Sequence, residues 1–581
     1  MNNTLKQNIT AFIMATFSFF IICSNNFLKS YDVTSWLIYV LILIVFFKTD
    51  ILGRKNRKES IIFSIILSII LVYGRLCFIN IDNRIVSVLR ETFKLDSLWN
   101  FICYFNILFV VFKNVFPKLY SLHILETGEK RISNKKLFIL CALIIFIGWL
   151  PYFFSFYPGT LTPDSLSEYT SIYKGIHIIS DHHPVLHALF IGLFYNLGML
   201  IFHSKTAAIA TTTVAQMVVL ASVFSYSIVF LKQRNVKKSI LVILTLCYAL
   251  LPVNGYYSIV MWKDVLFAGC IILLTTEVIK LIEKNAQKKL TKKDVISFIV
   301  VSLVCAFFRN NAIYMYFLLS LTLIWLFKKY NKLIITVSTI LVMVLYVVIK
   351  GPVFKLCGIQ KTESSEYIGI PLQQIGRMAF KDAKFTKTDR EAFKDLMPIE
   401  VMRDAYNPRS SDGIKFHSYY NMSEFDSNKS KYLKLYIKYV MKYPSLAIES
   451  YSISTLGFWY PGVEYWSVAN GIWENEFGLK TKSLIKNESD SFIRQIEQRA
   501  FPVLSIEWSV GLYFWMLFIF FYIGIRKKGI TALGVYMPCI GIWITMMLAS
   551  PVFAEFRYIY CVVVTIPMLI LYPYIEQKRF K

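Results

Sequence analysis

The chain has 581 residues, of which 56% are hydrophobic and 16% aromatic. Soluble domains are about 45–50% apolar, and this chain has many apolar stretches long enough to cross a bilayer, so the composition excludes a soluble enzyme. The net charge of +27 does not indicate nucleic-acid binding, because the basic residues come in short runs between apolar segments, as in the cytoplasmic loops of membrane proteins.

Fifteen apolar segments predict membrane helices, and we expect about 13–15 of them to cross the bilayer. The first segment has no small-residue cleavage site, so we predict an uncleaved N-terminal helix. Segments 238–252 and 295–308 are short for a hydrocarbon core of ~30 Å, and we expect them to be broken or differently tilted. The segments are 8–24, 34–48, 60–79, 98–114, 136–156, 185–203, 206–231, 238–252, 256–282, 295–308, 312–328, 332–350, 505–525, 530–550 and 556–575.

The basic loops set the predicted orientation, because lysine and arginine concentrate on the cytoplasmic side. One conflict arises: the predicted outer loop 157–184 and the basic loop 232–238 require an odd number of crossings, yet two apolar segments separate them. Either segment 185–203 does not cross fully, or the charge rule fails there. Otherwise the rule places both termini in the cytoplasm and places 157–184, 252–263, 309–311, 351–503 and 550–556 outside.

Four parts are predicted along the chain. Segment 351–503 is polar, has about as many acids as bases and is long enough for its own core, and its amphipathic patterns indicate a mainly helical extracytoplasmic domain. The fold class is therefore an all-α polytopic membrane protein with an inserted outer domain. The lysine, asparagine and isoleucine content is typical of an AT-rich genome and favours the plasma membrane of a Gram-positive bacterium. The remaining parts are transmembrane helices over 1–135, a transmembrane module over 136–350 and C-terminal transmembrane helices over 504–581.

Titratable side chains concentrate in the predicted outer loop 157–184 and at the start of the next helix. Such groups at a membrane boundary cost free energy unless they are solvated or paired, so their clustering indicates a site. A wet interfacial loop is the alternative, but Tyr-Pro-Gly, Pro-Asp-Ser and His-His-Pro are turn-forming segments that would hold the side chains in place. Nucleotide-binding and soluble-hydrolase motifs are absent from the sequence. The clustered residues are Asp164, Glu168, His177, Asp181, His182, His183 and His187.

The segments YPGTLTPDS (157–165) and DHHPVLH (181–187) resemble motifs of the GT-C superfamily of integral-membrane glycosyltransferases, such as the protein O-mannosyltransferases and the lipid A aminoarabinose transferases. The resemblance covers about 136–350 and implies a GT-C-like fold with a polyprenyl-phosphate sugar as donor. It places Asp164 at the catalytic acidic position. The family often pairs two acidic residues there, whereas here Ser165 follows Asp164 and Glu168 comes one helical turn later. Together with MWKD (261–264) and PLQQIGR (371–377), the chain also looks like an uncharacterised family of Gram-positive membrane proteins.

The chemistry of sugar transfer assigns roles to the candidate residues. A carboxylate must take a proton from the acceptor hydroxyl, and Asp164 is the candidate base. Cations or donors must hold the phosphate leaving group, where charge accumulates. Each candidate also has a structural interpretation: an interfacial ion pair for Lys263 and Asp264, a flanking anchor for Arg309, and a structural contact for Arg377. The predicted substrate-binding residues are His182, His183, Lys263, Asp264, Arg309, Gln374 and Arg377.

The paired histidines and an aromatic run are further candidates for binding. Adjacent histidines rarely chelate one ion unaided, so we assign no metal ligand and leave a divalent metal open as a cofactor. The aromatic run 458–460, with Tyr465 and Trp466, would stack on sugar faces or form an interfacial belt.

The leading hypothesis from the sequence is an inverting, lipid-dependent glycosyltransferase. It would move a sugar from a polyprenyl-phosphate donor to an envelope polymer, glycolipid or protein at the outer face of the plasma membrane, with no nucleic-acid partner. A polysaccharide polymerase or ligase is one alternative, since it shares the many helices, the large outer loop and the lipid-linked substrates. A lipid-linked saccharide transporter is another, although we find no internal repeat of the kind that transporters often carry.

Overall fold

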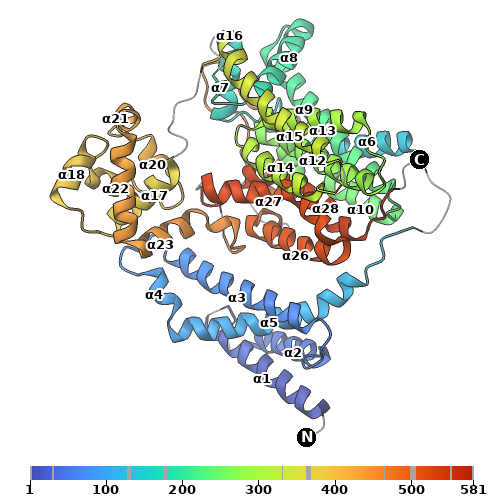
Figure 1. Ribbon diagram of the computed structural model, residues 1–581, viewed down its shortest axis with the longest axis vertical. Helices are drawn as coiled ribbons and strands as arrows, with labels where there is room; N and C mark the ends of the chain where they lie inside the picture. The colour runs from blue at the N-terminus through green and yellow to red at the C-terminus, as the bar shows by residue number, and fades with distance from the viewer. Residues whose placement is uncertain are drawn as a thin grey trace. The chain divides into compact units, whose positions relative to one another are not determined.

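The computed structural model describes residues 3–25, 27–28, 32–126, 132–174, 180–329, 331–360, 368–463, 465–497, 505–549 and 552–578. Regular structure in these ranges is helical, with isolated β-bridges and no β-strand. The chain forms two compact units (Figure 1). Unit 1 contains Met1–His123, Tyr367–Val463 and Pro551–Ala554, and unit 2 contains Ile124–Glu366, Glu464–Ser550 and Glu555–Lys581.

This division cuts across the predicted parts. The predicted outer domain over 351–503 contributes its middle, Tyr367–Val463, to unit 1 together with the N-terminal helices, whereas most of 464–503 packs with the helices of unit 2. This grouping depends on contacts between segments that are distant in the sequence, and such contacts cannot be predicted from composition.

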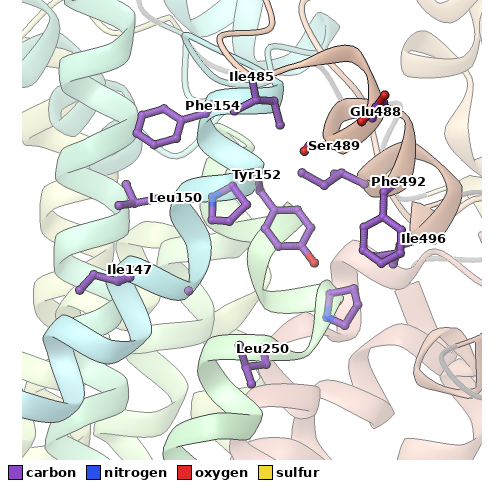
Figure 2. A pocket seen from close by; sticks show the side chains of 14 residues that line it. Ile147, Leu150, Tyr152, Phe154, Leu250, Ile485, Glu488, Ser489, Phe492 and Ile496 are labelled. Carbon is purple, nitrogen blue, oxygen red and sulfur yellow. The ribbon is translucent and has the colours of Figure 1, made fainter.

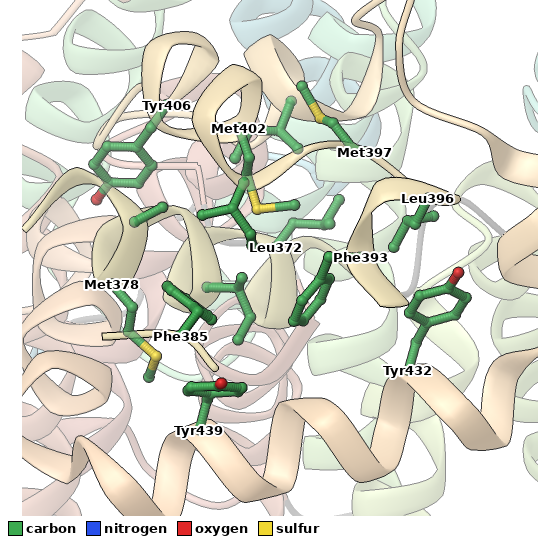
Figure 3. Close-up of a cluster of buried hydrophobic side chains, with 14 of the residues drawn as sticks. Leu372, Met378, Phe385, Phe393, Leu396, Met397, Met402, Tyr406, Tyr432 and Tyr439 are labelled. Carbon is green, nitrogen blue, oxygen red and sulfur yellow. The ribbon is translucent and has the colours of Figure 1, made fainter. Parts of the chain in front are cut away.

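Unit 1 combines apolar helices with a small helical lobe. In Figure 1, α1, α2, α3 and α5 lie side by side. The lobe has its own core, in which Tyr432 and Tyr439 of α22 point toward Leu372 and Phe393 (Figure 3). The helices are α1 (Asn3–Ser24), α2 (Val33–Lys48), α3 (Arg57–Ile79), α4 (Val88–Thr92), α5 (Leu95–Tyr120), α17 (Gly369–Phe380), α18 (Lys387–Lys394), α19 (Ile399–Ala405), α20 (Asp412–Lys415), α21 (Met422–Ser427), α22 (Lys429–Lys442) and α23 (Pro444–Ser454), followed by the 3-10 turn η4 (Leu456–Phe458).

The other helices of unit 2 surround α12. This helix is apolar on all sides and almost entirely buried, as expected for a central helix. Its neighbours include α9, α13, α27 and α28. The elements are α6 (Asn134–Ser155), α7 (Pro163–Lys174), α8 (Val185–Phe202), α9 (Lys205–Lys232), α10 (Lys238–Leu250), α11 (Pro252–Ile259), α12 (Lys263–Ala286), α13 (Lys292–Phe308), α14 (Ala312–Leu326), α15 (Lys332–Val348), η2 (Ile349–Val353), α16 (Phe354–Leu356), α24 (Asn487–Glu497), η5 (Ile506–Trp508), α26 (Val510–Lys528), η6 (Gly529–Thr531), α27 (Ala532–Ala549), α28 (Phe556–Leu571) and η7 (Tyr572–Tyr574).

The chain is a multi-pass membrane protein by the length and apolarity of these helices. All fifteen predicted segments fall on helices. In the described residues, ten stretches satisfy the length and composition of a membrane span, or eleven if α10 and α11 form one bent span. This is fewer than the predicted 13–15, because α2, α13 and α14 have only 16, 17 and 15 residues and because α26 and α27 form one continuous stretch, Val510–Ala549.

The two ends of unit 2 differ in charge. At one end, which we call the basic end, Lys237 N–H donates to Ile124 O at 2.8 Å, and Arg234 pairs with Glu283 at 2.6 Å. The C-terminal Lys578 reaches Gln233 there at 2.9 Å. Segments of unit 2 predicted to be cytoplasmic therefore meet at one end. Loops 157–184, 252–263 and 309–311, which are predicted to be outside, contact one another at the other end of α12.

The crossing conflict concerns the helix pair α8–α9. Gly198 of α8 packs so closely on α9 that a Cβ atom there would lie 2.6 Å from Ala208 Cα, so the two helices form a tight antiparallel hairpin. Thr213, well inside α9, donates to Pro158 O at 2.8 Å at the end opposite the basic end. The stretch of α9 after Thr213 therefore runs to the basic end, while α8 runs away from it. These directions are the ones expected if segment 185–203 does not cross fully, while by length and apolarity α8 also qualifies as a span.

The short segment 238–252 is broken, as predicted, whereas segment 295–308 lies in the unbroken helix α13. α10 and α11 meet at an angle of 52° at Leu251, directly before Pro252. Glu507 is buried beside this break. Its Oε2 accepts a hydrogen bond from Val253 N–H at 3.5 Å, and its Oε1 has no hydrogen-bond partner in the described part of the chain. Burial raises the pKa of Glu507 to about 8.

We expect unit 2 to lose stability as the pH rises toward 8. Folded Glu507 holds its proton to about pH 8, whereas the unfolded carboxyl releases it near pH 4.5, so the stabilisation present below pH 4.5 is lost through that window. The loss should be on the order of 3–5 kcal/mol, at ~1.4 kcal/mol per pKa unit. Thermal unfolding of the detergent-solubilised protein from pH 5 to 9 measures it. Glu507→Gln should flatten the profile, while Glu488→Gln, at an exposed position on α24, should leave it unchanged. A Glu507→Gln profile that matches wild type would contradict this assignment.

Candidate active site

The loop after α6 is held against the segment that leads into α12. Thr160 N–H donates to Ile259 O at 2.9 Å, and Met261 N–H donates to Thr160 O at 3.1 Å. Gln216, buried in α9, donates to Ser258 O and Val260 O at 2.9 Å each. Gly159 has φ +138°, and a Cβ there would lie 2.3 Å from Thr213 Oγ1, so only glycine fits. These contacts bring the Asp164 and Lys263 segments together.

Asp164 lies in the first turn of α7, after Pro163, where a carboxylate is favoured by the helix dipole. One of its oxygens accepts a hydrogen bond from Arg557 at 2.6 Å, and its side chain is 35% exposed. Burial raises the pKa of Asp164, but the nearby charges of Arg557 and Lys263 lower it more, to about 2. Asp164 is therefore a carboxylate at any physiological pH, accessible and held between cations.

A buried acid–histidine group lies next to Lys263. His187 Nδ1 is 2.6 Å from Glu168 Oε2, and both side chains are almost fully buried. His183 Nδ1 lies 3.8 Å from the other oxygen of Glu168 and 3.5 Å from Lys263 Nζ. Burial and the Lys263 charge lower the pKa of His183 to about 4. His183 is thus neutral at pH 7, and Glu168 holds the His187 imidazole in place.

Behind this group lies a second ion pair. Arg309, at the end of α13, is 3.3 Å from Asp264, and both side chains are buried. Arg309 also donates to Tyr558 O at 3.0 Å. Both oxygens of Asp264 lack a hydrogen bond in the described part of the chain. Buried pairs of this kind are costly unless they position other groups, and this one joins the start of α12 to the start of α28.

Arg557 is the site residue that sequence reasoning missed. It lies 2.6 Å from Asp164 and 3.3 Å from Glu555, and its guanidinium is 5.3 Å from the centre of the Trp262 ring. A signal was present: an arginine opens the last apolar segment on the predicted outer side, where basic residues are disfavoured.

Two predicted substrate-binding residues belong to unit 1 and have structural contacts there. Arg377 is fully buried and donates to Glu449 at 2.6 and 3.1 Å and to Ile81 O at 2.7 Å. Gln374 donates to Ala447 O at 3.0 Å and accepts from Tyr436 at 2.5 Å. These contacts occupy the guanidinium of Arg377 and the amide of Gln374, which are the groups that a phosphate or sugar would need.

The remaining predicted residues are placed as follows. Asp164, His183, Lys263, Asp264 and Arg309 come together at one end of unit 2. His182 is exposed, with its ring edge-on to that of His183. His177 lies outside the described residues.

The donor set of this site bears on the divalent metal that the sequence leaves open. Among the residues that the structure describes, no three His, Cys, Asp or Glu side chains are grouped so that they could hold an ion. Asp164 and Asp264 each face an arginine instead.

An open apolar cavity lies at the same end of unit 2. Figure 2 shows Ile147, Leu150 and Phe154 of α6 facing Phe492 and Ile496 of α24 across it. Its volume is about 860 Å³, and Glu488 and Ser489 are its polar lining residues besides Tyr152. Its wall continues toward the site, because Leu484 N–H donates to Phe154 O and Lys482 N–H donates to Tyr157 O, each at 2.8 Å.

Comparison with known proteins gives a family. Residues 174–580 match a family of unknown function, DUF6020. The match includes Lys263, Arg309 and Arg557, whereas Asp164 lies just before its start. No curated protein and no solved structure matches the chain. Since the matched region is well over half of its length, the chain belongs to the DUF6020 family of unknown function.

Proposed function

We propose that the protein is a GT-C-like membrane glycosyltransferase that moves a sugar from a polyprenyl-phosphate donor to an acceptor of the cell envelope. The observation that carries the proposal is the accessible Asp164 carboxylate, held 2.6 Å from Arg557 and within the field of Lys263. A carboxylate between two cations provides both a base and a phosphate site. The motif resemblance around Asp164 supports the same chemistry.

The proposed step uses these residues directly. The acceptor hydroxyl attacks the anomeric carbon of the donor sugar, and Asp164 takes the hydroxyl proton. The bond from the anomeric carbon to the phosphate oxygen breaks, and the electron pair leaves with the lipid phosphate. Arg557 and Lys263 stabilise the charge that accumulates on that phosphate.

Donor binding would also prepare the base. In the resting site Asp164 has a pKa of about 2 and is a weak base. The singly charged phosphodiester of the donor, bound to Arg557 and Lys263, would offset part of the positive charge that lowers this pKa, and Asp164 would become more basic when the donor is present. Trp466 is 44% exposed and offers a face for a sugar, and its ring centre lies 6.1 Å from that of the buried Trp262. The apolar cavity beside α6 is suited to a lipid chain.

A lipid-linked saccharide transporter is the second candidate. The bent α10–α11 span and the buried Asp264–Arg309 pair favour it, because transporters often use broken helices and buried charges. Both features are connected to the candidate site, so neither one distinguishes a transferase from a transporter. The role of Asp164 does, because sugar transfer needs its carboxylate and transport does not.

The test is the sugar composition of cell envelopes from a deletion strain. The strain is complemented with wild type, Asp164→Asn or Asp294→Asn at matched expression, the last changing a carboxylate at the basic end. We expect one sugar to disappear on deletion, to return with wild type and Asp294→Asn, and to stay absent with Asp164→Asn. A loss of at least ~10²-fold in transfer is expected for a missing base. Full restoration by Asp164→Asn would overturn the proposal and favour transport.

A further inference from the structure

A groove between α6 and α10 lies at the basic end of unit 2, opposite the candidate active site. We propose that it binds one anionic phospholipid, with an acyl chain between the helices and the phosphate at the start of α10. The groove encloses about 230 Å³, several times the ~30 Å³ of a water molecule.

The walls of the groove suit an acyl chain. α6 contributes Leu137, Leu140 and Ile144, and α10 contributes Leu241, Val242 and Leu246. The floor is the contact between the two helices, where Cys141 Sγ and Thr245 Oγ1 lie 3.4 Å apart. Leu140 and Val242 are each nearly half exposed, so the groove opens sideways along the apolar surface of two helices. In a multi-pass membrane protein that surface contacts lipid.

The charged residues gather at one end of the groove, as an amphiphile requires. Lys238 is the first residue of α10 and is exposed, and no side chain caps the free N–H groups of this helix end. An anion there would gain from the lysine and from the helix dipole together. Lys232 also lines the groove and donates to Ile132 O and to Asn134 Oδ1. Glu126 also lines the groove, so the charge of its lining is positive by one.

Lipid in this groove would influence the candidate active site without touching it. α6 leads directly into the loop that carries Asp164, and α10 leads through α11 to Lys263. An acyl chain between α6 and α10 would hold these two helices at a defined spacing. The inference itself stands on the groove and does not depend on the proposed reaction.

The experiment uses the full chain purified in detergent and stripped of lipid. Unfolding midpoints are measured with added phosphatidylglycerol or phosphatidylcholine of the same acyl chains. We expect phosphatidylglycerol to raise the midpoint by about 3 °C or more, as a ligand of the folded state does, and phosphatidylcholine to raise it much less. Native mass spectrometry of the same samples should show one retained phosphatidylglycerol.

Two variants and their matched controls locate the effect. Lys238→Ala should remove at least half of the shift, while Lys293→Ala, at an exposed lysine of the same end outside the groove, should keep it. Val242→Trp, which fills the groove, should remove the retained lipid, while Leu143→Trp, on α6 outside the groove, should not.

Equal responses of Lys238→Ala and Lys293→Ala would show non-specific attraction to the basic end. An equal rise of the unfolding midpoint with phosphatidylcholine would show that the groove binds the acyl chain and not the anionic headgroup. Either result overturns the proposal.

Discussion

Replacing Arg557 with alanine is expected to lower the rate of sugar transfer by ~10²–10³-fold, the range found when one donor to a developing oxyanion is removed. The guanidinium lies 2.6 Å from Asp164, so in the proposed reaction it both holds the base at rest and binds the phosphate that leaves. The measurement is the rate at which the missing sugar reappears in envelopes of the deletion strain after induced expression. Arg557→Lys keeps the positive charge but loses the planar guanidinium, which can bind a phosphate through two N–H groups. This variant should therefore transfer sugar at an intermediate rate.

Two controls separate chemistry from folding in this experiment. Arg526→Ala removes a guanidinium from an exposed position at the basic end and should leave transfer unchanged. The unfolding midpoint of purified Arg557→Ala shows whether the protein is folded under the assay conditions. A folded Arg557→Ala protein that transfers sugar at the wild-type rate would refute the phosphate-binding role.

Arg377→Ala is expected to destabilise unit 1 by about 3 kcal/mol or more. Its guanidinium is fully buried and pairs with Glu449, and breaking one side of a buried pair leaves an uncompensated charge. Lys381, 3.1 Å from the same carboxylate, reduces the loss. Thermal unfolding of the purified protein, together with proteolysis of the lobe, measures the effect.

A second variant distinguishes this structural role from substrate binding. Adding Glu449→Gln to Arg377→Ala removes the unpaired charge and should recover part of the stability. Arg409→Ala breaks an exposed pair with Asp82 in the same unit and should cost no more than ~1 kcal/mol. If Arg377→Ala is as stable as wild type yet abolishes sugar transfer, the residue acts in the reaction, as its sequence context first indicated.

Local patterns in the sequence predicted the helices well. Apolar runs of about 20 residues mark helices whatever their partners are, because the backbone must satisfy its hydrogen bonds internally within lipid. The same reasoning predicted the break of 238–252, since Pro252 follows directly and cannot continue the helix. Charge in the loops predicted which loops meet, because the basic loops gather at one end of unit 2.

The candidate site was predicted in part. Asp164, His183 and Lys263 come from turn-forming or helix-start segments, where titratable groups are noticeable against an apolar background, and these three are brought together. Arg557 was missed because it lies almost 400 residues from Asp164 and in no recognised motif. Arg377 and Gln374 looked equally suitable in the sequence, but they are buried in unit 1 with internal partners. Residue type alone does not distinguish a ligand-binding arginine from a structural one.

Sequence was therefore enough for the properties that each segment carries alone: membrane helices, their breaks, the charged loops and the acidic turn at Asp164. The tertiary structure was needed for every property that depends on a distant partner. It separated the middle of 351–503 from its flanks, turned α8 away from the basic end and set Arg557 against Asp164. The physical reason is that burial and pairing decide the role of a charged side chain, and both are set by which helices pack together.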